Sequence, residues 1–292
     1  MKLNLIGPFK VNAPFATEIA FAKGLRANGH TVVEFDPNLD DPAAIDRDAD
    51  FTVVFKTALR HNDHLLGLRN VVLYQPDDLR FSHIREMVLM MRRYSEHLIV
   101  FRDYGEGFPP ETNEFNTVSV LPVTADPDLY YHEPFTERDI DFCFIGSLGS
   151  SAHWQRLRMR AILESLGHRV VFGSTNDVSV IRRMYGRSKI VVNHASDEDL
   201  PFGSGYGYQC RHFEVGMTRS CLLSNFVLDD VPKLIDGYVP FRDEAQFIDR
   251  AQHLLEDGLL REHYSSALYS DVITRHSPSV RAGQLVRILE IL

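Results

Sequence analysis

Short apolar runs alternate with helix-like stretches along most of this chain, and this alternation restricts the possible fold more than any other feature. In the first half the apolar runs are LNLIG, TVVEF, FTVVF, VVLYQ, HLIVF and VSVLP. Apolar strands separated by helical segments are typical of a parallel sheet that helices cover. The pattern therefore predicts an α/β protein.

The alternation stops after Leu121, in the segment LPVTADPDLYYHEPFTERD, which is rich in proline and acids and has no period. Such a segment is typical of an interdomain linker. A second alternation begins at Ile140–Ile145 and continues through RVVF, KIVVN, CLLSN and YVPF. Helices are expected over 154–166, 243–257 and 259–273, and a last one over 278–292. We therefore expect two Rossmann-like domains in tandem, residues 1–125 and 126–277.

Composition limits the classes of partner. The chain has 40 acidic and 31 basic residues and a formal charge of -9, which disfavours nucleic acid as a partner without excluding it. No apolar run approaches the ~20 residues of a membrane span, and the first residues do not form a signal peptide, so a cytoplasmic location is expected. The cysteines show no C-x-x-C spacing and are expected to be reduced, buried thiols: Cys143, Cys210 and Cys221.

The loop GSLGSS follows the strand Ile140–Ile145 and precedes a helix. In parallel sheets such a loop presents free N–H groups and a helix N-terminus to an anion. Its glycines allow close approach of a phosphate, its serines offer hydroxyls, and two nearby arginines add charge. The candidates are Gly146, Ser147, Leu148, Gly149, Ser150, Ser151, Arg156 and Arg158. The alternative is a tight turn built from small residues, and G-x-G-x-x-G spacing is missing, so binding of a dehydrogenase-type dinucleotide is not supported.

One carboxylate, Glu214, lies inside an amphipathic helix that is followed at once by the apolar strand CLLSN. A carboxylate in that place is either solvated or holds a polar group. Phe213 and Met217 occupy the buried stripe beside it, which places Glu214 near a sheet end, where ligands bind. Arg211 and His212 lie on the first turns of the same helix.

The pattern Arg-x-Phe-Glu-x-x-Met over 211–217, before an apolar strand, resembles the nucleotide-sugar segment of GT-B-fold glycosyltransferases, especially the CgeB-like branch of the group 1 transferases. The linker LPVTADPDLYY and the segment DIDFCFIGSLGSSAHWQRLRMRAIL are similar to the family's entry into its second domain. The closing helices, with His276 and Arg281, resemble the family's C-terminal region. The resemblance covers roughly residues 70–290.

The resemblance implies a GT-B fold, in which two Rossmann-like domains turn parallel sheets toward a central cleft and the helix at 278–292 crosses back to the first domain. It implies that Glu214 accepts hydrogen bonds from the ribose hydroxyls of the donor nucleotide, and that the loop at 146–151 receives the diphosphate. The implied activity is transfer of a hexose or pentose from a nucleotide-diphosphate sugar to an acceptor hydroxyl bound by the first domain. We expect retention of configuration and neither a metal nor another cofactor.

Two departures from the family pattern affect this interpretation. Many group 1 transferases have a second glutamate eight positions before the ribose-binding one, where this chain has Tyr206. The sugar contact must then come from elsewhere, and Asp197, Glu198 and Asp199 are candidates. The usual Arg-x-x-x-x-Lys pair for the diphosphate is also missing, which leaves only Arg156, Arg158 and Arg211. A nucleotide-sugar epimerase of the same fold and a non-catalytic nucleotide-sugar-binding protein therefore stay as alternatives.

In the first domain, catalytic or acceptor-binding residues are expected at the carboxyl ends of the strands. Asp77 and Asp78 directly follow the strand VVLY, and His83 comes soon after them. Adjacent acids are also common as helix caps or solvated groups, and a retaining enzyme does not need a protein base. Further candidates in this half are Lys10, Asn12, His61 and Asp63.

The sequence motifs give little support to a metal site, a serine hydrolase or a P-loop nucleotidase. Asp-x-Asp occurs at 46–48, 126–128 and 197–199, and of these the third is the one that could contact the sugar or the acceptor. The 13 histidines show no H-x-H or H-E-x-x-H spacing, and neither G-x-S-x-G nor the P-loop motif is present. The sequence therefore does not predict a metal site.

Overall fold

The structure is a computed structural model, and it describes residues 1–9, 17–55, 67–75, 82–101, 108–134, 137–149, 154–194, 202–205, 208–227 and 233–292. The chain divides into two compact units. Unit 1 consists of Met1–Thr124 together with Ser277–Leu292, and unit 2 consists of Ala125–His276. Each contains a sheet whose recorded strand pairs are all parallel, which confirms the α/β prediction.

Unit 1 has a parallel sheet of six strands in the order β2-β1-β3-β4-β5-β6. Its strands are β1 (Lys2–Ile6), β2 (Thr31–Phe35), β3 (Phe51–Phe55), β4 (Val71–Gln75), β5 (His97–Val100) and β6 (Thr117–Val120). Its helices are α1 (Thr17–Ala27), α2 (Ser82–Met91) and α8 (Pro278–Glu290), with short 3-10 helices η1 (Pro42–Ala44) and η4 (Pro110–Glu114). The strands coincide with the apolar runs of the sequence, because the central strands β1, β3, β4 and β5 bury side chains on both faces.

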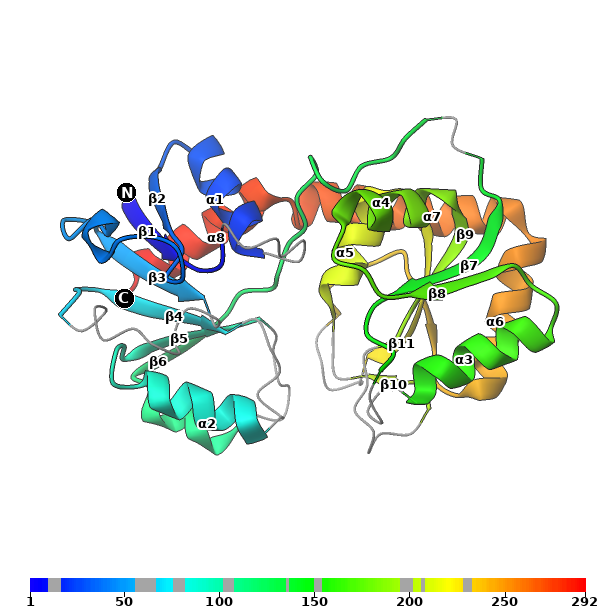
Figure 1. Cartoon of the computed structure of the whole chain (residues 1–292), viewed down its shortest axis with the longest axis horizontal. Coiled ribbons are helices and arrows are strands. Elements are labelled where there is room, and N and C mark those ends of the chain that lie inside the picture. The colour runs from blue at the N-terminus through cyan, green and yellow to red at the C-terminus, as the bar shows by residue number, and fades with distance from the viewer. Residues whose placement is uncertain are drawn as a thin grey trace. The chain divides into compact units, whose positions relative to one another are not determined.

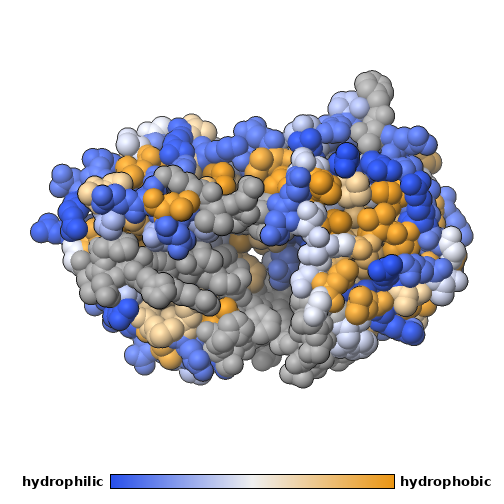
Figure 2. Space-filling view, in the orientation of Figure 1, coloured by the Kyte–Doolittle hydropathy of each residue, from blue (hydrophilic) through white to orange (hydrophobic). Residues whose placement is uncertain are grey.

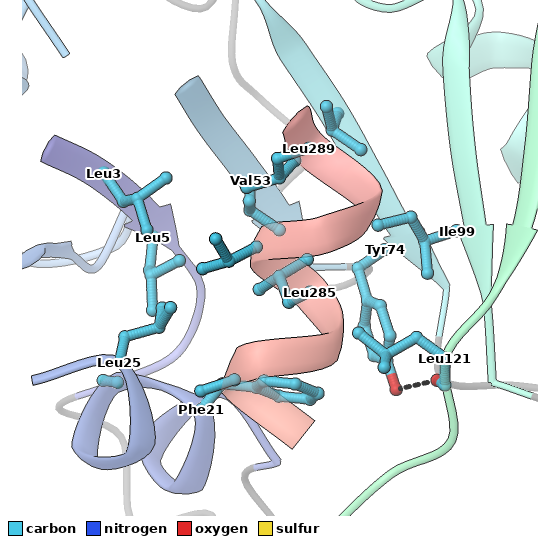
Figure 3. Close-up of a cluster of buried hydrophobic side chains, with 14 of the residues drawn as sticks. Leu3, Leu5, Phe21, Leu25, Val53, Tyr74, Ile99, Leu121, Leu285 and Leu289 are labelled. Carbon is cyan, nitrogen blue, oxygen red and sulfur yellow. Dashed lines mark hydrogen bonds between the residues drawn. The ribbon is translucent and has the colours of Figure 1, made fainter. Parts of the chain in front are cut away.

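Helices cover both faces of the unit 1 sheet (Figure 1). On one face, apolar residues of α1 and α8 pack on the central strands, and Figure 3 shows Leu285 and Leu289 of α8 among them. At the end of this cluster the Tyr74 hydroxyl donates a 2.9 Å hydrogen bond to the Leu121 carbonyl. On the other face, Ile84, Val88 and Met91 of α2 pack on the sheet.

The contact between α1 and α8 is close because Gly24 has no side chain. A Cβ atom placed on Gly24 would lie 2.1 Å from the Pro278 carbonyl oxygen and 3.0 Å from the Ala282 Cβ. Nearby, the Asn28 side-chain amide donates a 2.8 Å hydrogen bond to the Ser279 carbonyl. Helix α8 is therefore an integral part of unit 1, although all of unit 2 precedes it in the chain.

Unit 2 has a sheet in the order β10-β11-β9-β7-β8, with β12 also paired to β11. Its strands are β7 (Ile140–Ile145), β8 (Val170–Gly173), β9 (Ser188–Asn193), β10 (Ser204–Gly205), β11 (Cys221–Val227) and β12 (Val239–Phe241). Its helices are α3 (Trp154–Ser165), α4 (Val178–Arg187), α5 (Cys210–Met217), α6 (Glu244–Glu256) and α7 (Gly258–Arg275). Of the cysteines, Cys143 and Cys221 are buried and Cys210 is half-buried, and all three are free thiols.

The helical spacing of Trp154, Leu157, Ala161, Ile162 and Leu166 in the sequence predicts a buried stripe along α3, and the structure buries a different face. Met159, Ile162 and Leu163 are buried, but Trp154 and Leu157 are each 45% exposed.

In the space-filling view, hydrophilic and hydrophobic patches alternate over the visible surface of both units (Figure 2). Among the helices of the described ranges, none combines the length and the apolar character that crossing a bilayer requires.

Candidate anion-binding site

The carboxyl ends of β7 and β9 lie next to each other in the unit 2 sheet, since these strands pair in parallel with Phe142 opposite Ile190. The first turn of α5 and the first turn of α3 bring two arginines, Arg211 and Arg156, to this edge. In parallel sheets this is the edge at which ligands bind. The described part of the loop that begins at Gly146 lies between the two arginines.

Arg211 is held by neutral acceptors from three elements. Its guanidinium lies 4.6 Å from the centre of the Phe144 ring and donates to the Ile145 carbonyl, to Asn193 Oδ1 and, over 3.3 Å, to the Tyr185 hydroxyl. Although burial opposes its charge, Tyr185 and Glu214 raise the pKa of Arg211 above the ordinary value. The side chain is therefore a fixed cation.

Arg156 lies against the same aromatic ring. Its guanidinium is 5.2 Å from the centre of the Phe144 ring and donates to the Ser147 carbonyl at 2.7 Å and to the His194 carbonyl at 3.2 Å. Burial, together with the positive charge of Arg211, lowers its pKa to about 10, so it stays charged at neutral pH. The bond to Ser147 ties Arg156 to the loop predicted to hold phosphate.

Neither guanidinium forms an ion pair with a carboxylate anywhere in the described ranges. Their recorded acceptors are carbonyl, amide and hydroxyl oxygens. Arg158 differs, because it forms an exposed pair with Glu244 at 2.7 Å. Two partly desolvated cations that share one ring repel each other, and a phosphate or diphosphate would relieve this repulsion through charge-assisted hydrogen bonds.

Gly146 must be small for this arrangement to form. A Cβ atom at this position would lie 2.7 Å from Nη2 of Arg211 and 3.0 Å from Cζ of Phe144. The Gly146 N–H donates a 2.8 Å bond to the Gly173 carbonyl, so it is not free for an anion. In the rest of the described loop, Ser147 and Gly149 are exposed and Leu148 is half-buried.

Glu214 lies one turn after Arg211 on α5 and is only 3% exposed. Burial raises the pKa of its carboxyl to about 7, while the charge of Arg211 and a hydrogen bond from the Tyr130 side chain act in the opposite direction. Its neighbours Phe213 and Met217 are buried, as the helical stripe predicted. The carboxyl is therefore held inside unit 2, within electrostatic reach of Arg211, and is not a solvated surface group.

His212 has a structural position in the same helix. Its Nδ1 accepts a 3.0 Å hydrogen bond from the Gln209 N–H, which closes the N-terminal cap of α5. The ring contacts Tyr208 and Tyr238 edge-on, and burial lowers its pKa to about 3, so it is neutral. Within the described residues its Nε2 has no hydrogen-bond partner.

The structure therefore brings together Gly146, Ser147, Arg156, Arg211 and Glu214. Leu148 and Gly149 continue the described loop, Arg158 pairs with Glu244, and His212 caps α5. Twelve other candidates lie outside the described residues: Lys10, Asn12, His61, Asp63, Asp77, Asp78, Ser150, Ser151, Asp197, Glu198, Asp199 and Tyr206. His83 belongs to α2, but its side chain is also outside the description. In the described ranges no group of three or more His, Cys, Asp or Glu side chains could hold a metal ion.

Four residues that complete the surroundings of Arg211 and Glu214 were not predicted: Tyr130, Phe144, Tyr185 and Asn193. They come from the linker, β7, α4 and β9. Phe144 and Asn193 lie at the carboxyl ends of predicted strands, and this position was the sequence feature that could have identified them. The two tyrosines carried no signal, because their role depends on contacts across more than 25 positions of the chain.

Comparison with known proteins identifies the family. The model of the glycosyl transferase-like family matches residues 131–287, more than half of the 292 residues. The chain belongs to the glycosyl transferase-like family. The matched residues include α3, α5 and the loop that begins at Gly146. The family's sequence pattern therefore covers Arg156, Arg211 and Glu214. No curated protein matches the sequence.

Solved structures of glycosyltransferases share the fold. An alpha-glucosyltransferase in complex with UDP and a 13-mer DNA containing an HMU base has a TM-score of 0.72 at 12% identity, over 99% of each chain. Sucrose-phosphate synthase from Thermosynechococcus elongatus has a TM-score of 0.64 at 12% identity, over 100% of this chain and 99% of the other. AviGT4, a glycosyltransferase involved in avilamycin A biosynthesis, has a TM-score of 0.63 at 14% identity, over 100% of this chain and 98% of the other. The GT-B fold expected from the sequence is confirmed, and neither alternative function is favoured by these matches.

Proposed function

We propose that this member of the family transfers a sugar from a UDP-sugar to an acceptor hydroxyl, with retention of configuration and without a metal at the diphosphate. The observation that supports this proposal most is the pair of guanidiniums of Arg156 and Arg211 on Phe144, which has no carboxylate partner in the described structure. Structural neighbours that carry UDP in their complexes agree with a uridine nucleotide as the donor. We place the protein in the CgeB-like branch on the pattern at 211–217.

The chemical demand of this reaction is stabilisation of negative charge. As the bond between the anomeric carbon and the diphosphate oxygen breaks, the electron pair remains on the departing UDP. Arg156 and Arg211 supply two fixed cations for that charge, already held by backbone carbonyls and Asn193. Because the groups are pre-positioned and partly desolvated, they act more strongly than solvated arginines would.

Glu214 is proposed to bind the ribose of the donor. An ionised carboxylate accepts hydrogen bonds from two adjacent hydroxyls, and these bonds lower the pKa of a buried carboxyl. With a pKa of about 7 before binding, Glu214 is about half ionised at neutral pH. Donor binding should therefore strengthen as pH rises through 7, because the carboxylate is the form that accepts both hydrogen bonds.

A panel of UDP-sugars tests the proposal. The protein is incubated with each donor in the presence of excess EDTA, and released UDP is measured alongside NMR spectra of the sugar. We expect UDP release that EDTA does not abolish, and a first-formed sugar with the anomeric configuration of the donor. A strict manganese requirement, an inverted anomer, or conversion of the sugar without UDP release would each contradict a named part of the proposal.

A further inference from the structure

Unit 1 contains a buried carboxyl group that the sequence analysis did not single out. Glu18 lies in the first turn of α1 and is 7% exposed. A Cβ atom placed on Gly7, the residue after β1, would lie 3.3 Å from Cγ and 3.5 Å from Oε1 of Glu18, and 3.5 Å from Cβ of Phe55. The carboxyl group therefore lies under Gly7, at the carboxyl ends of the neighbouring strands β1 and β3.

The part of the surroundings that the structure describes includes an aromatic cluster around Phe55. Phe21, one turn further along α1, packs on Phe55 and Tyr74 with ring centres 6.1 Å and 5.5 Å apart, and Phe55 packs on Tyr74 at 5.1 Å. Figure 3 shows Phe21 and Tyr74 in this cluster. Burial raises the pKa of Glu18 to about 7, and the opposing hydrogen bond comes from the N–H of Glu18 itself. No other described residue is recorded as a donor to this carboxylate or as its ion-pair partner.

Other buried carboxylates of the chain have partners. Asp36, which follows β2 and is fully buried, accepts a 3.0 Å hydrogen bond from the Asn38 N–H. Asp271, which is 8% exposed, pairs with Arg275 and accepts a 2.8 Å bond from the Asp236 N–H. A buried carboxylate without such donors reduces stability. A buried carboxyl group whose recorded donor is its own N–H therefore needs an explanation, and a functional role supplies one.

We propose that Glu18 is an acceptor-binding residue, whose carboxylate accepts hydrogen bonds from hydroxyl groups of a polyhydroxylated acceptor at the carboxyl edge of the unit 1 sheet. This inference rests on the proposed transfer to a hydroxyl, because hydroxyls are then the donors that the acceptor brings. The small residue at Gly7 keeps a side chain away from the carboxyl group on the strand side. The location is also the edge of a parallel sheet at which ligands bind.

The test measures the pKa of the Glu18 carboxyl group by NMR, with and without methyl α-D-glucopyranoside as the hydroxyl probe. The carboxyl carbons of glutamate are labelled with 13C, and the Glu18 signal is assigned by its loss in Glu18→Gln. Hydrogen bonds from hydroxyls favour the charged form, so the probe should lower the pKa of Glu18 by roughly half a unit or more. The permethylated glucoside, which has the same ring without hydroxyls, should leave the titration unchanged.

Thermal unfolding at pH 8 provides the second measurement. If Glu18 serves to bind an acceptor, Glu18→Gln should raise the midpoint of unfolding, because it removes a buried charge for which the described residues provide no ion-pair partner. Glu34→Gln, which affects an ion pair with the exposed Arg26, should leave the Glu18 titration with the probe unchanged. A titration that the glucoside does not move, or a lower midpoint for Glu18→Gln, overturns the proposal.

Calorimetry with UDP on the wild-type protein separates the two proposals. If UDP does not bind, the proposed donor is wrong, but the response of Glu18 to the hydroxyl probe still decides its own role. If UDP binds and the glucoside leaves Glu18 unaffected, the donor site stands and the acceptor role of Glu18 fails.

Discussion

Replacing Glu214 by glutamine should make the protein more stable and a weaker nucleotide binder at the same time. The pKa of Glu214 is raised from 4.5 to about 7. The folded state therefore prefers the neutral carboxyl, and ionisation destabilises it. This destabilisation is absent below pH 4.5, grows as pH rises toward 7, and is fully developed above 7. Glutamine resembles the neutral carboxyl, so the variant avoids the destabilisation that ionisation causes.

The magnitude follows from the shift. At about 1.4 kcal/mol per pKa unit, Glu214→Gln should raise the free energy of unfolding by up to about 3 kcal/mol at pH 8, and by under about 1 kcal/mol at pH 5. UDP should bind about 10- to 100-fold more weakly, because hydrogen bonds from the ribose to a charged group are lost.

Urea unfolding at the two pH values and calorimetric titration with UDP measure both effects. Glu256→Gln, at an exposed position on α6, is the matched control and should change stability by less than about 0.5 kcal/mol. A Glu214→Gln variant that is less stable at pH 8, or that binds UDP as tightly as the wild type, would refute the argument.

Two further predictions use pairs of matched positions. Arg156→Met should weaken UDP binding about 10-fold or more, because a half-buried cation is lost, whereas Arg158→Met should change it by less than about twofold; equal effects in calorimetry would exclude the special role of Arg156. Gly24→Ala should lower the free energy of unfolding by about 1–3 kcal/mol, since the new Cβ would overlap the Pro278 carbonyl at 2.1 Å. Gly283→Ala, whose nearest neighbour lies at 3.7 Å, should raise it by up to about 1 kcal/mol through helix propensity; denaturant curves that fail to separate the two would contradict the packing.

The fold was largely predictable because its central strands are buried on both faces. Runs such as FTVVF and HLIVF give an unambiguous signal when helices shield both sides of a sheet, and they became β3 and β5. The helical pattern was less informative on α3, where Trp154 and Leu157 are exposed and Met159 and Leu163 form the buried face. An apolar stripe shows that a helix is amphipathic, but packing against its neighbours decides which side chains are covered.

The candidate site was predictable only in part. Gly146, Arg211 and Glu214 belong to local motifs, and local motifs can be read from a sequence. Their hydrogen-bond partners Tyr130 and Tyr185 come from segments far away in the chain. Glu18 escaped notice for a related reason, since its burial depends on the strands that surround α1 and not on its own neighbours in sequence.

Helix α8 also affects how the chain can fold during synthesis. The apolar face of the unit 1 sheet is completed by Leu285 and Leu289, which the ribosome adds only after every residue of unit 2. The core of unit 1 is therefore complete only after unit 2 has been synthesised, so the apolar residues that α8 covers lack that cover while the chain is growing.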